Sequence, residues 1–158
     1  MPVERSAGAI IFHKPRSRTS SLRGKNKEIK YLLLHYPSGS RTSRDYWDLP
    51  KGHIEENEDE TDTVIREVKE ETGLENIKII EGFKEFIKYF FKSKGKTIFK
   101  TVVFYLAETG DQDVKVSFEH TGYKWLLYEE ALSQLTFKNA KEILKKANEF
   151  LTKHAARS

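Results

Sequence analysis

One stretch constrains this chain more than any other: residues 52–74, GHIEENEDETDTVIREVKEETGL, which read as a loop that leads into a strongly acidic helix. Asn57 is a suitable N-cap, and Glu60 stands three residues later, where a capping box places an acidic side chain. Gly73 suits the left-handed residue that ends a helix. The stretch therefore predicts a helix between Asn57 and Gly73.

Three glutamates gather on one face of this predicted helix. They stand at positions i, i+3 and i+4, so their carboxylates share an arc of about 100°: Glu67, Glu70 and Glu71. The neighbouring arc holds the aliphatic residues that we expect to pack on the body of the protein: Val64, Ile65 and Val68. The acidic face should therefore lie at the edge of a cleft.

The charge of this region needs a physical explanation. Residues 55–75 contain ten acidic residues against two basic ones, a local net charge of −8. Like charges at these spacings destabilise a helix by roughly a few tenths of a kcal/mol per pair, and a hard divalent cation with oxygen ligands offsets that repulsion. The alternative from the residues alone is a solvated acidic helix without a ligand.

The remainder of the chain is basic. The whole chain carries a formal net charge of +4, so the part outside residues 55–75 carries +12. This distribution suits a cation pocket with a positive rim and a polyanionic ligand such as a phosphate chain. Ordinary lysine-rich solubility is the alternative, and charge alone does not separate the two.

Length and composition indicate a single domain over residues 1–158. Hydrophobic residues make up 37% and charged residues 33%, no apolar run is as long as a membrane span, and the N-terminus has no signal-peptide pattern. We therefore expect a cytoplasmic protein without membrane association, as a monomer or a weak dimer. The absence of cysteine excludes disulfides and thiolate metal sites.

Alternating and apolar patterns predict the remaining elements. We expect strands over residues 3–13 and 28–36, a short strand over 77–81, a hairpin over 82–108 with its turn at 93–96, a strand from residue 123 and a helix over 129–135. Residues 14–27 and 37–45 are polar loops by composition. A stripe with the 3.6-residue period predicts a C-terminal helix that packs on a sheet through Phe137, Ala140, Ile143, Leu144, Ala147, Phe150 and Leu151.

The first strand of the predicted hairpin has two different faces. One face carries Phe83, Ile87, Tyr89 and Phe91, and the other carries Lys84, Phe86, Lys88, Phe90 and Lys92. Lysines between aromatic residues are typical of surfaces that bind single-stranded nucleic acid. They also fit a half-buried sheet whose lysines reach outward, or a site where one aromatic residue stacks on a nucleobase while lysines hold phosphates. The residues alone leave these three interpretations open.

The spacing of the acidic stretch is more specific than its charge. This segment resembles the Nudix box at each of the defined positions of that motif. The matching residues are Gly52, Glu58, Arg66, Glu67, Val68, Glu70, Glu71, Gly73 and Leu74. Residues 47–53, WDLPKGH, are similar to the lead-in of that family. The resemblance implies an α/β/α sandwich with a mixed central sheet, and an enzyme that hydrolyses a phosphoanhydride with a divalent cation.

The resemblance also implies roles for individual residues. We expect Glu67 and Glu71 to bind Mg²⁺, which Mn²⁺ can replace, with the backbone carbonyl of Lys51 and with Glu119 as a candidate fourth carboxylate. Glu70 completes this site or acts as the general base, and Glu71 is the other candidate for the catalytic proton transfer. Four residues of the motif are expected to have structural roles: Gly52, Glu58, Arg66 and Gly73. Of these, Glu58 and Arg66 are expected to form a charge-assisted pair.

Segments outside the box are most similar to the asymmetric diadenosine-tetraphosphate hydrolases: residues 8–12, 31–34, 79–84, 100–103 and 119–126. That resemblance implies a dinucleoside polyphosphate substrate that is cleaved to ATP and AMP. Tyr89 is the first candidate to stack on adenine, and Tyr123 is the second. The other candidate substrate contacts are Lys84, Lys100, Lys51 and His53.

The basic loop 14–27 and two arginines, Arg41 and Arg44, depart from that subfamily and keep other substrates open. These are triphosphorylated RNA 5′ ends and diphosphoinositol polyphosphates. Damaged nucleoside triphosphates are a further alternative within the same class of enzyme. From a different class, a catalytically silent nucleotide- or RNA-binding module is the alternative. The complete set of glutamates in the box argues against that module.

Overall fold

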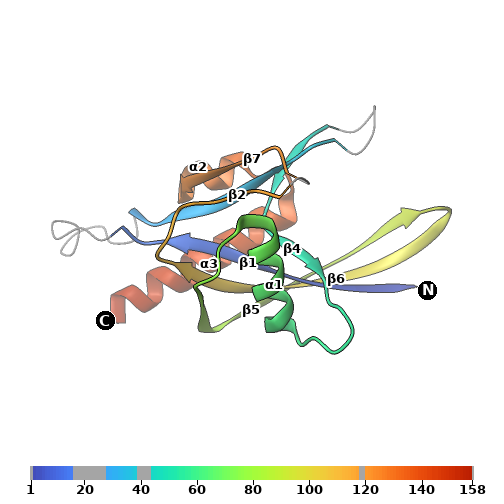
Figure 1. Cartoon of the computed structure of the whole chain (residues 1–158), viewed down its shortest axis with the longest axis horizontal. Coiled ribbons are helices and arrows are strands. Elements are labelled where there is room, and N and C mark those ends of the chain that lie inside the picture. The colour runs from blue at the N-terminus through green and yellow to red at the C-terminus, as the bar shows by residue number, and fades with distance from the viewer. Residues whose placement is uncertain (1, 16–27, 39–43, 118–119, 158) are drawn as a thin grey trace.

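The computed structural model describes residues 2–15, 28–38, 44–117 and 120–157. The strands are β1 (Val3–His13), β2 (Lys30–Tyr36), β3 (Tyr46–Asp48), β4 (Lys51–His53), β5 (Ile77–Ser93), β6 (Lys96–Thr109) and β7 (Gly122–Leu127). The helices are α1 (Glu60–Thr72), α2 (Tyr128–Gln134) and α3 (Lys138–Arg157). The helices α1 and α3 lie on opposite sides of the sheet, and α2 contacts α3 (Figure 1).

The central sheet is mixed, as the sequence predicted. Its main strand order is β3-β2-β1-β6-β5, while β4 pairs with β1 and β7 pairs with β2. The strands β1 and β6 run parallel, and the other pairs are antiparallel. One edge of β1 is shared, because residues 6–8 pair with β4 and residues 12–13 pair with β2. The short strand β4 therefore enters the sheet where it also contacts α1.

Two hydrophobic clusters fill the two faces of the sheet, because successive residues of a strand point to opposite sides. The cluster under α1 consists of Ala7, Ala9, Ile11, Leu32, Leu34, Val64, Val68, Leu74, Val103, Ala107 and Val114. The cluster under α2 and α3 includes Ile10, Phe12, Leu33, Phe104, Leu106, Ala131, Ile143, Leu144 and Ala147. These layers confirm the predicted α/β/α sandwich.

Helix α1 corrects one predicted cap and confirms the other. The N-cap is Asp59 rather than Asn57, and it forms a capping box with Asp62. Asn57 instead has φ 68° and belongs to the preceding turn. Gly73 ends the helix in the left-handed conformation with φ 76°, as predicted. Ile65, which we expected to pack on the protein body, is 48% exposed, so the buried arc of α1 is narrower than predicted.

The strands follow the predicted pattern with three corrections. The short strands β3 and β4 lie in segments for which no strand was predicted. Strand β1 has the predicted bounds, whereas β2 begins at Lys30 instead of Glu28. The predicted short strand and the first hairpin strand are one continuous strand, β5, with a register irregularity between Ile79 and Lys84. The tight turn at Lys94-Gly95 has positive φ at both residues, the geometry of a two-residue hairpin turn.

Helix α3 buries most of the predicted stripe, namely Ala140, Ile143, Leu144, Ala147 and Leu151. Phe150 is half-buried against the same core, whereas Phe137 precedes the helix and is 46% exposed. No helix within the described ranges combines the length and the apolar character that crossing a membrane requires.

Candidate active site

The carboxylate of Glu67 lies against the backbone of β4. A Cβ atom added to Gly52 would lie 2.0 Å from Glu67 Cδ and 2.1 Å from Glu67 Oε1, so any side chain at this position would have to displace the Glu67 carboxylate. The pairing of β4 with β1 is equally close, since a Cβ atom at Gly8 would lie 2.5 Å from the carbonyl oxygen of Pro50. Glu67 is thereby held beside the peptide bond that joins Lys51 to Gly52.

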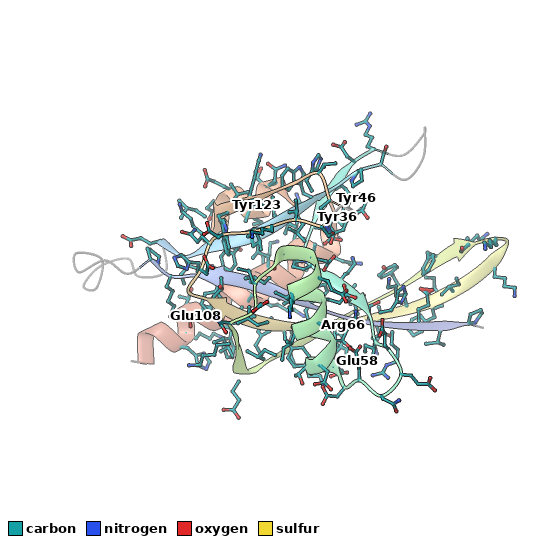
Figure 2. All side chains as sticks on the ribbon, in the orientation of Figure 1. Tyr36, Tyr46, Glu58, Arg66, Glu108 and Tyr123 are labelled. Atoms are coloured by element: carbon teal, nitrogen blue, oxygen red, sulfur yellow. The ribbon has the colours of Figure 1, made fainter. Side chains whose placement is uncertain are left out.

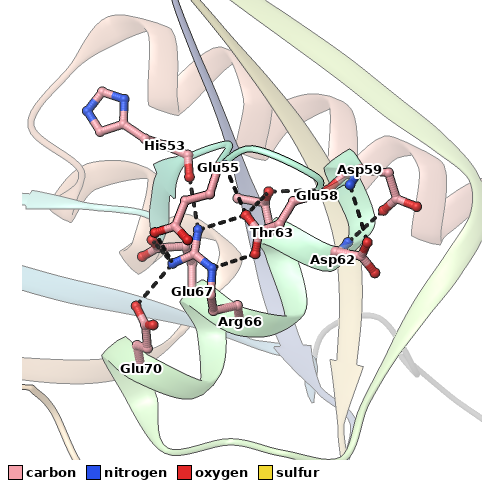
Figure 3. Close-up of polar contacts among 9 residues, drawn as sticks. All are labelled: His53, Glu55, Glu58, Asp59, Asp62, Thr63, Arg66, Glu67 and Glu70. Carbon is pink, nitrogen blue, oxygen red and sulfur yellow. Dashed lines mark hydrogen bonds and ion pairs between the residues drawn. The ribbon is translucent and has the colours of Figure 1, made fainter.

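Arg66 ties the loop before α1 to the acidic face of the helix (Figure 3). Its Nε donates to Glu58 Oε2 at 2.6 Å, and its Nη2 donates to Glu58 Oε1 at 3.0 Å and to the carbonyl oxygen of His53 at 2.9 Å. Its Nη1 donates to Glu67 Oε1 at 2.8 Å and to Glu70 Oε2 at 3.3 Å. The predicted pair of Glu58 and Arg66 is confirmed, and the same guanidinium orients two of the three glutamates.

Glu58 is the best satisfied carboxylate of the loop. Its Oε1 also accepts from the Glu55 N–H at 3.0 Å and from Thr63 Oγ1 at 2.9 Å. Hydrogen bonds from Arg66, and then from the Glu55 N–H, lower the pKa of Glu58 to about 2. The same pairing raises the pKa of Arg66 above its ordinary value. The pair is therefore fully ionised at neutral pH.

Glu71 is the most buried of the three glutamates, with 5% of its surface exposed. The Tyr36 hydroxyl donates to Glu71 Oε1 at 3.3 Å, and His120 Nε2 lies 3.3 Å from the same oxygen. His120 Nδ1 in turn lies 2.8 Å from Ser117 Oγ, which fixes the orientation of the ring. Neither Tyr36 nor His120 was predicted as a site residue from the sequence. The one signal for His120 was its position directly after the candidate ligand Glu119.

Glu67 and Glu71 influence each other through their charges. Burial, and then the charge of Glu71, raise the pKa of Glu67 to about 7, although Arg66 acts in the opposite direction. Two nearby carboxylates repel each other when both are ionised. A proton on one of them, or a cation bound between them, relieves this repulsion. The acidic face therefore carries negative charge that a bound cation would neutralise.

A cavity of about 420 Å³ lies on the α3 side of the sheet. Its lining residues are Tyr46, Asp48, Lys51, Ile87, Tyr89, Lys100, Val102, Phe104, Phe137, Asn139 and Ala140. Lys51 links the two regions, because it lines the cavity and the next residue in β4, Gly52, lies against the Glu67 carboxylate. The cavity and the acidic face therefore meet at β4.

Aromatic rings connect the cavity to Glu71. The ring of Tyr46 is stacked on that of Tyr36 with a centroid distance of 4.9 Å, and it lies 5.2 Å from the ring of Phe137 (Figure 2). Tyr36 is the residue whose hydroxyl reaches Glu71. Tyr89 lines the cavity from β5. Tyr46, Phe137 and Tyr89 therefore give the cavity a wide aromatic wall.

Two lysines place positive charge in the same cavity. Lys51 Nζ donates to Asp48 Oδ2 at 2.9 Å. Burial acts to lower the pKa of Lys51, but Asp48 outweighs it and the pKa is raised. Burial, and then the charge of Lys51, lower the pKa of Lys100. An anion bound between the two ammonium groups would be favoured because it relieves their repulsion.

These features agree with the comparison with protein families. The model of the NUDIX domain matches residues 14–147. The chain belongs to the Nudix family.

Individual relatives of this Nudix chain are similar over nearly all of its length. The asymmetrical bis(5′-nucleosyl)-tetraphosphatase of Sus scrofa is 37% identical over 96% of this chain and 98% of the relative. The crystal structure of a binary complex of the Caenorhabditis elegans Ap4A hydrolase has a TM-score of 0.72 and 31% identity, and covers 94% of this chain and 98% of that one. An RNA pyrophosphohydrolase of Nitratiruptor is 30% identical over 69% of this chain and 76% of the relative.

Nudix hydrolases generally need a divalent cation, and the residues of this site fit one. All of the predicted ligands are oxygen atoms, which Mg²⁺ prefers, and Glu67 and Glu71 lie close enough to perturb each other. Within the described ranges, no group of three acidic or histidine side chains has the arrangement of a metal site, and the Glu70 carboxylate accepts a hydrogen bond from Arg66. The predicted ligand Glu119 lies outside the described residues.

The structure separates the predicted substrate contacts into two groups. Tyr89, Lys51 and Lys100 line one cavity. Lys84 lies on the opposite face of the sheet, where its Nζ is 2.9 Å from Glu60 Oε1. Tyr123 is 40% exposed on β7, away from the cavity lining, and His53 is exposed and contributes its carbonyl oxygen to Arg66. A substrate role for all six of these residues stays a prediction.

Proposed function

We propose that this Nudix hydrolase cleaves diadenosine tetraphosphate asymmetrically to ATP and AMP, with Mg²⁺ as its cation and Mn²⁺ as a substitute. The observation that carries the proposal is the double position of Lys51, whose backbone adjoins the acidic face while its side chain lines the aromatic cavity. A nucleotide with its base in the cavity would extend its phosphate chain toward the glutamates. The names of the similar Sus scrofa and Caenorhabditis elegans enzymes support the same substrate.

The cavity offers complementary contacts for one nucleotide end of this substrate. We assign adenine to the aromatic wall, with Tyr89 as the stacking residue and Phe137 and Tyr46 as the other apolar surfaces. Lys51 and Lys100 would hold the adjoining phosphates, since their side chains line the same cavity. Asp48 keeps Lys51 charged and oriented for this contact.

The acidic face would perform the chemistry on the phosphate chain. Glu67, Glu71 and the carbonyl oxygen of Lys51 would hold the divalent cation, with Glu119 as the candidate fourth ligand. When bound, the cation neutralises charge on the phosphate oxygens and lowers the pKa of the attacking water. Glu70 or Glu71 accepts the proton of that water as it attacks phosphorus, and the bridging oxygen leaves with the departing phosphate chain. Arg66 keeps Glu67 and Glu70 in place during this step.

Product analysis in ¹⁸O-labelled water tests this function. Diadenosine tetraphosphate is incubated with the protein and Mg²⁺, the products are separated, and the identity and ¹⁸O content of each product are determined by mass spectrometry. We expect equal amounts of ATP and AMP, with the label in AMP, because water attacks the phosphorus next to that adenosine. Formation of two ADP molecules, or no turnover at a saturated cation site, would contradict the proposal.

Removal of pyrophosphate from RNA 5′ ends is the second candidate function. It is favoured by the similarity to an RNA pyrophosphohydrolase and by the lysines that the cavity contains. Release of pyrophosphate from a triphosphorylated oligonucleotide, compared with turnover of diadenosine tetraphosphate under the same conditions, separates the two functions. The expected cytoplasmic location and monomeric or weakly dimeric state stay predictions.

A further inference from the structure

We propose that the face of the β5–β6 hairpin on the α1 side of the sheet binds single-stranded nucleic acid, separately from the hydrolytic site. This outer hairpin face consists of Phe86, Lys88, Phe90 and Lys92 on β5, Phe99 and Thr101 on β6, and Val3 and Arg5 on β1. The cavity residues Tyr89 and Lys100 belong to the opposite face of the same strands. The proposed surface is therefore distinct from the cavity in which we place the nucleotide.

Strand register turns the alternating sequence into rows across three strands. Phe90 stands opposite Phe99, which stands opposite Val3, so these three residues form an apolar row. Lys88 stands opposite Thr101, which stands opposite Arg5, so the next row carries cations at both ends. Rows on one face are separated by two residues of strand, about 7 Å. Stripes of aromatic and basic character thus alternate along the hairpin.

The apolar row is exposed to solvent instead of being covered by a helix. In this row Phe90 is 61% exposed and Val3 is 62% exposed, and Phe86, which stands opposite Val103 in another row, is 49% exposed. The ring of Phe90 lies 4.9 Å from that of Phe99, which supports it from one side and leaves the other side open. The hairpin and the first residues of β1 extend beyond α1 (Figure 1). Exposed aromatic rings on a sheet are the stacking platforms that single-stranded nucleic acids use.

The charge of the hairpin is complementary to a polyanion. Residues 84–100 contain six lysines and one acidic residue, Glu85, which is 2.9 Å from Lys146 Nζ on the α3 side. On the outer face, the acidic start of α1 is already partly neutralised, because Glu60 contacts Lys84, Arg5 and the Tyr105 hydroxyl. Lys88 and Lys92 are exposed beyond that cluster. A phosphate backbone would therefore meet a positive surface along the hairpin.

The pattern favours a single strand over other polyanionic partners. A duplex hides the faces of its bases in the stack, so it cannot use the exposed rings of Phe86 and Phe90. A membrane-binding surface gathers its apolar residues in one block, whereas the apolar row here is flanked by cations. A second copy of this face would bring the same lysines and arginine together, which like-charge repulsion disfavours.

Fluorescence anisotropy tests the proposal with the full-length protein. A labelled 12-nucleotide oligouridylate is titrated at several salt concentrations in EDTA, so that the result does not depend on the hydrolytic site or on the substrate assigned to it. We expect binding whose logarithmic affinity falls linearly with the logarithm of salt concentration. A duplex RNA of the same length should bind more weakly, because its bases are not available for stacking.

Two sets of variants separate charge from stacking. Lys88→Ser combined with Lys92→Ser should reduce the magnitude of the salt slope by about 1.4, since each phosphate contact on a single strand contributes about 0.7. Phe86→Leu and Phe90→Leu retain apolar surface but remove the ring, and each should weaken binding by about fivefold or more. Lys138→Ser combined with Lys153→Ser, two exposed lysines on α3, is the control that changes the charge equally elsewhere.

The outcomes are distinct. Loss of binding in the hairpin variants, with the α3 control and the turnover of diadenosine tetraphosphate unchanged, supports the proposal. Equal weakening by both lysine pairs, full binding by the leucine variants, or equal affinity for duplex RNA would overturn it. Binding to phosphatidylserine vesicles without binding to the oligonucleotide would also overturn it and assign the face to a membrane surface.

Discussion

The carboxylate of Glu67 occupies the space into which a side chain at position 52 would project. An ideal Cβ atom on Gly52 would lie 2.0 Å from Glu67 Cδ, which is far inside van der Waals contact. Arg66 holds the same carboxylate from the other side with a 2.8 Å hydrogen bond. The position of this predicted cation ligand therefore depends on the absence of one methyl group in β4.

Gly52→Ala should consequently displace Glu67 while the sandwich stays folded. We expect the turnover number to fall by about 100-fold, because a displacement of about 1 Å in a catalytic site has an effect of that size. The affinity for Mn²⁺, measured by thermal shift, should fall with it. Gly110→Ala is the matched control, since nothing lies within 4 Å of its added Cβ atom. Equal activity of both variants would contradict the assignment of Glu67.

Glu71→Gln keeps the size of the side chain and its contact with the Tyr36 hydroxyl but removes the negative charge. We expect turnover to fall by several orders of magnitude, as when a cation ligand or a catalytic base is lost. Mg²⁺ should also stabilise the variant less than the wild-type protein against thermal unfolding. Glu75→Gln, an exposed change in the segment that follows the same helix, should alter neither property. Near-normal turnover of Glu71→Gln would exclude Glu71 from the site.

The ion pair of Glu58 and Arg66 predicts a pH dependence of the stability. The folded-state pKa of Glu58 is about 2, below its ordinary value of 4.5. The pair therefore stabilises the fold above pH 4.5, and this contribution is lost as the pH falls toward 2. Glu58→Gln should lower the denaturation midpoint at pH 7, and the difference from the wild-type protein should shrink between pH 4.5 and 2. If the difference in midpoint between Glu58→Gln and the wild-type protein stayed constant from pH 4.5 to 2, the role of this ion pair in stability would be contradicted. Glu56→Gln, which changes an exposed neighbour, is the control.

The sequence predicted those parts of the site that short-range contacts determine. The resemblance to the Nudix box indicated the pair of Arg66 and Glu58, which lie eight residues apart on adjoining segments. The position of Gly73 directly after its helix indicated its role as the cap. The N-cap was wrong for a related reason. Asn57 and Asp59 each have an acidic residue three positions later, and only the turn conformation of Asn57 decides between them. Overlapping local signals of equal strength cannot be separated without the tertiary structure.

The cavity was less predictable because distant segments build it. Tyr46, Tyr89 and Phe137 come from β3, β5 and the segment before α3, and the fold alone brings them together. Phe137 fits the period of the apolar stripe, so the sequence assigned it to packing, yet it is 46% exposed in the cavity wall. His120 beside Glu71 was missed for the same reason. Periodicity indicates which side of an element is apolar, and not which neighbour that side meets.

Tyr89 provides the sharpest test of the nucleotide assignment. Tyr89→Ala should raise the KM for diadenosine tetraphosphate by about 5- to 150-fold, since stacking on one base contributes about 1–3 kcal/mol. The KM for an inositol pyrophosphate, which has no base, should change little. Tyr89→Phe should restore binding because it keeps the ring. Phe91→Ala is the control, because Phe91 lies 6.2 Å from Tyr89 on the same strand but outside the cavity lining. Equal effects of Tyr89→Ala on both substrates would remove Tyr89 from the adenine site.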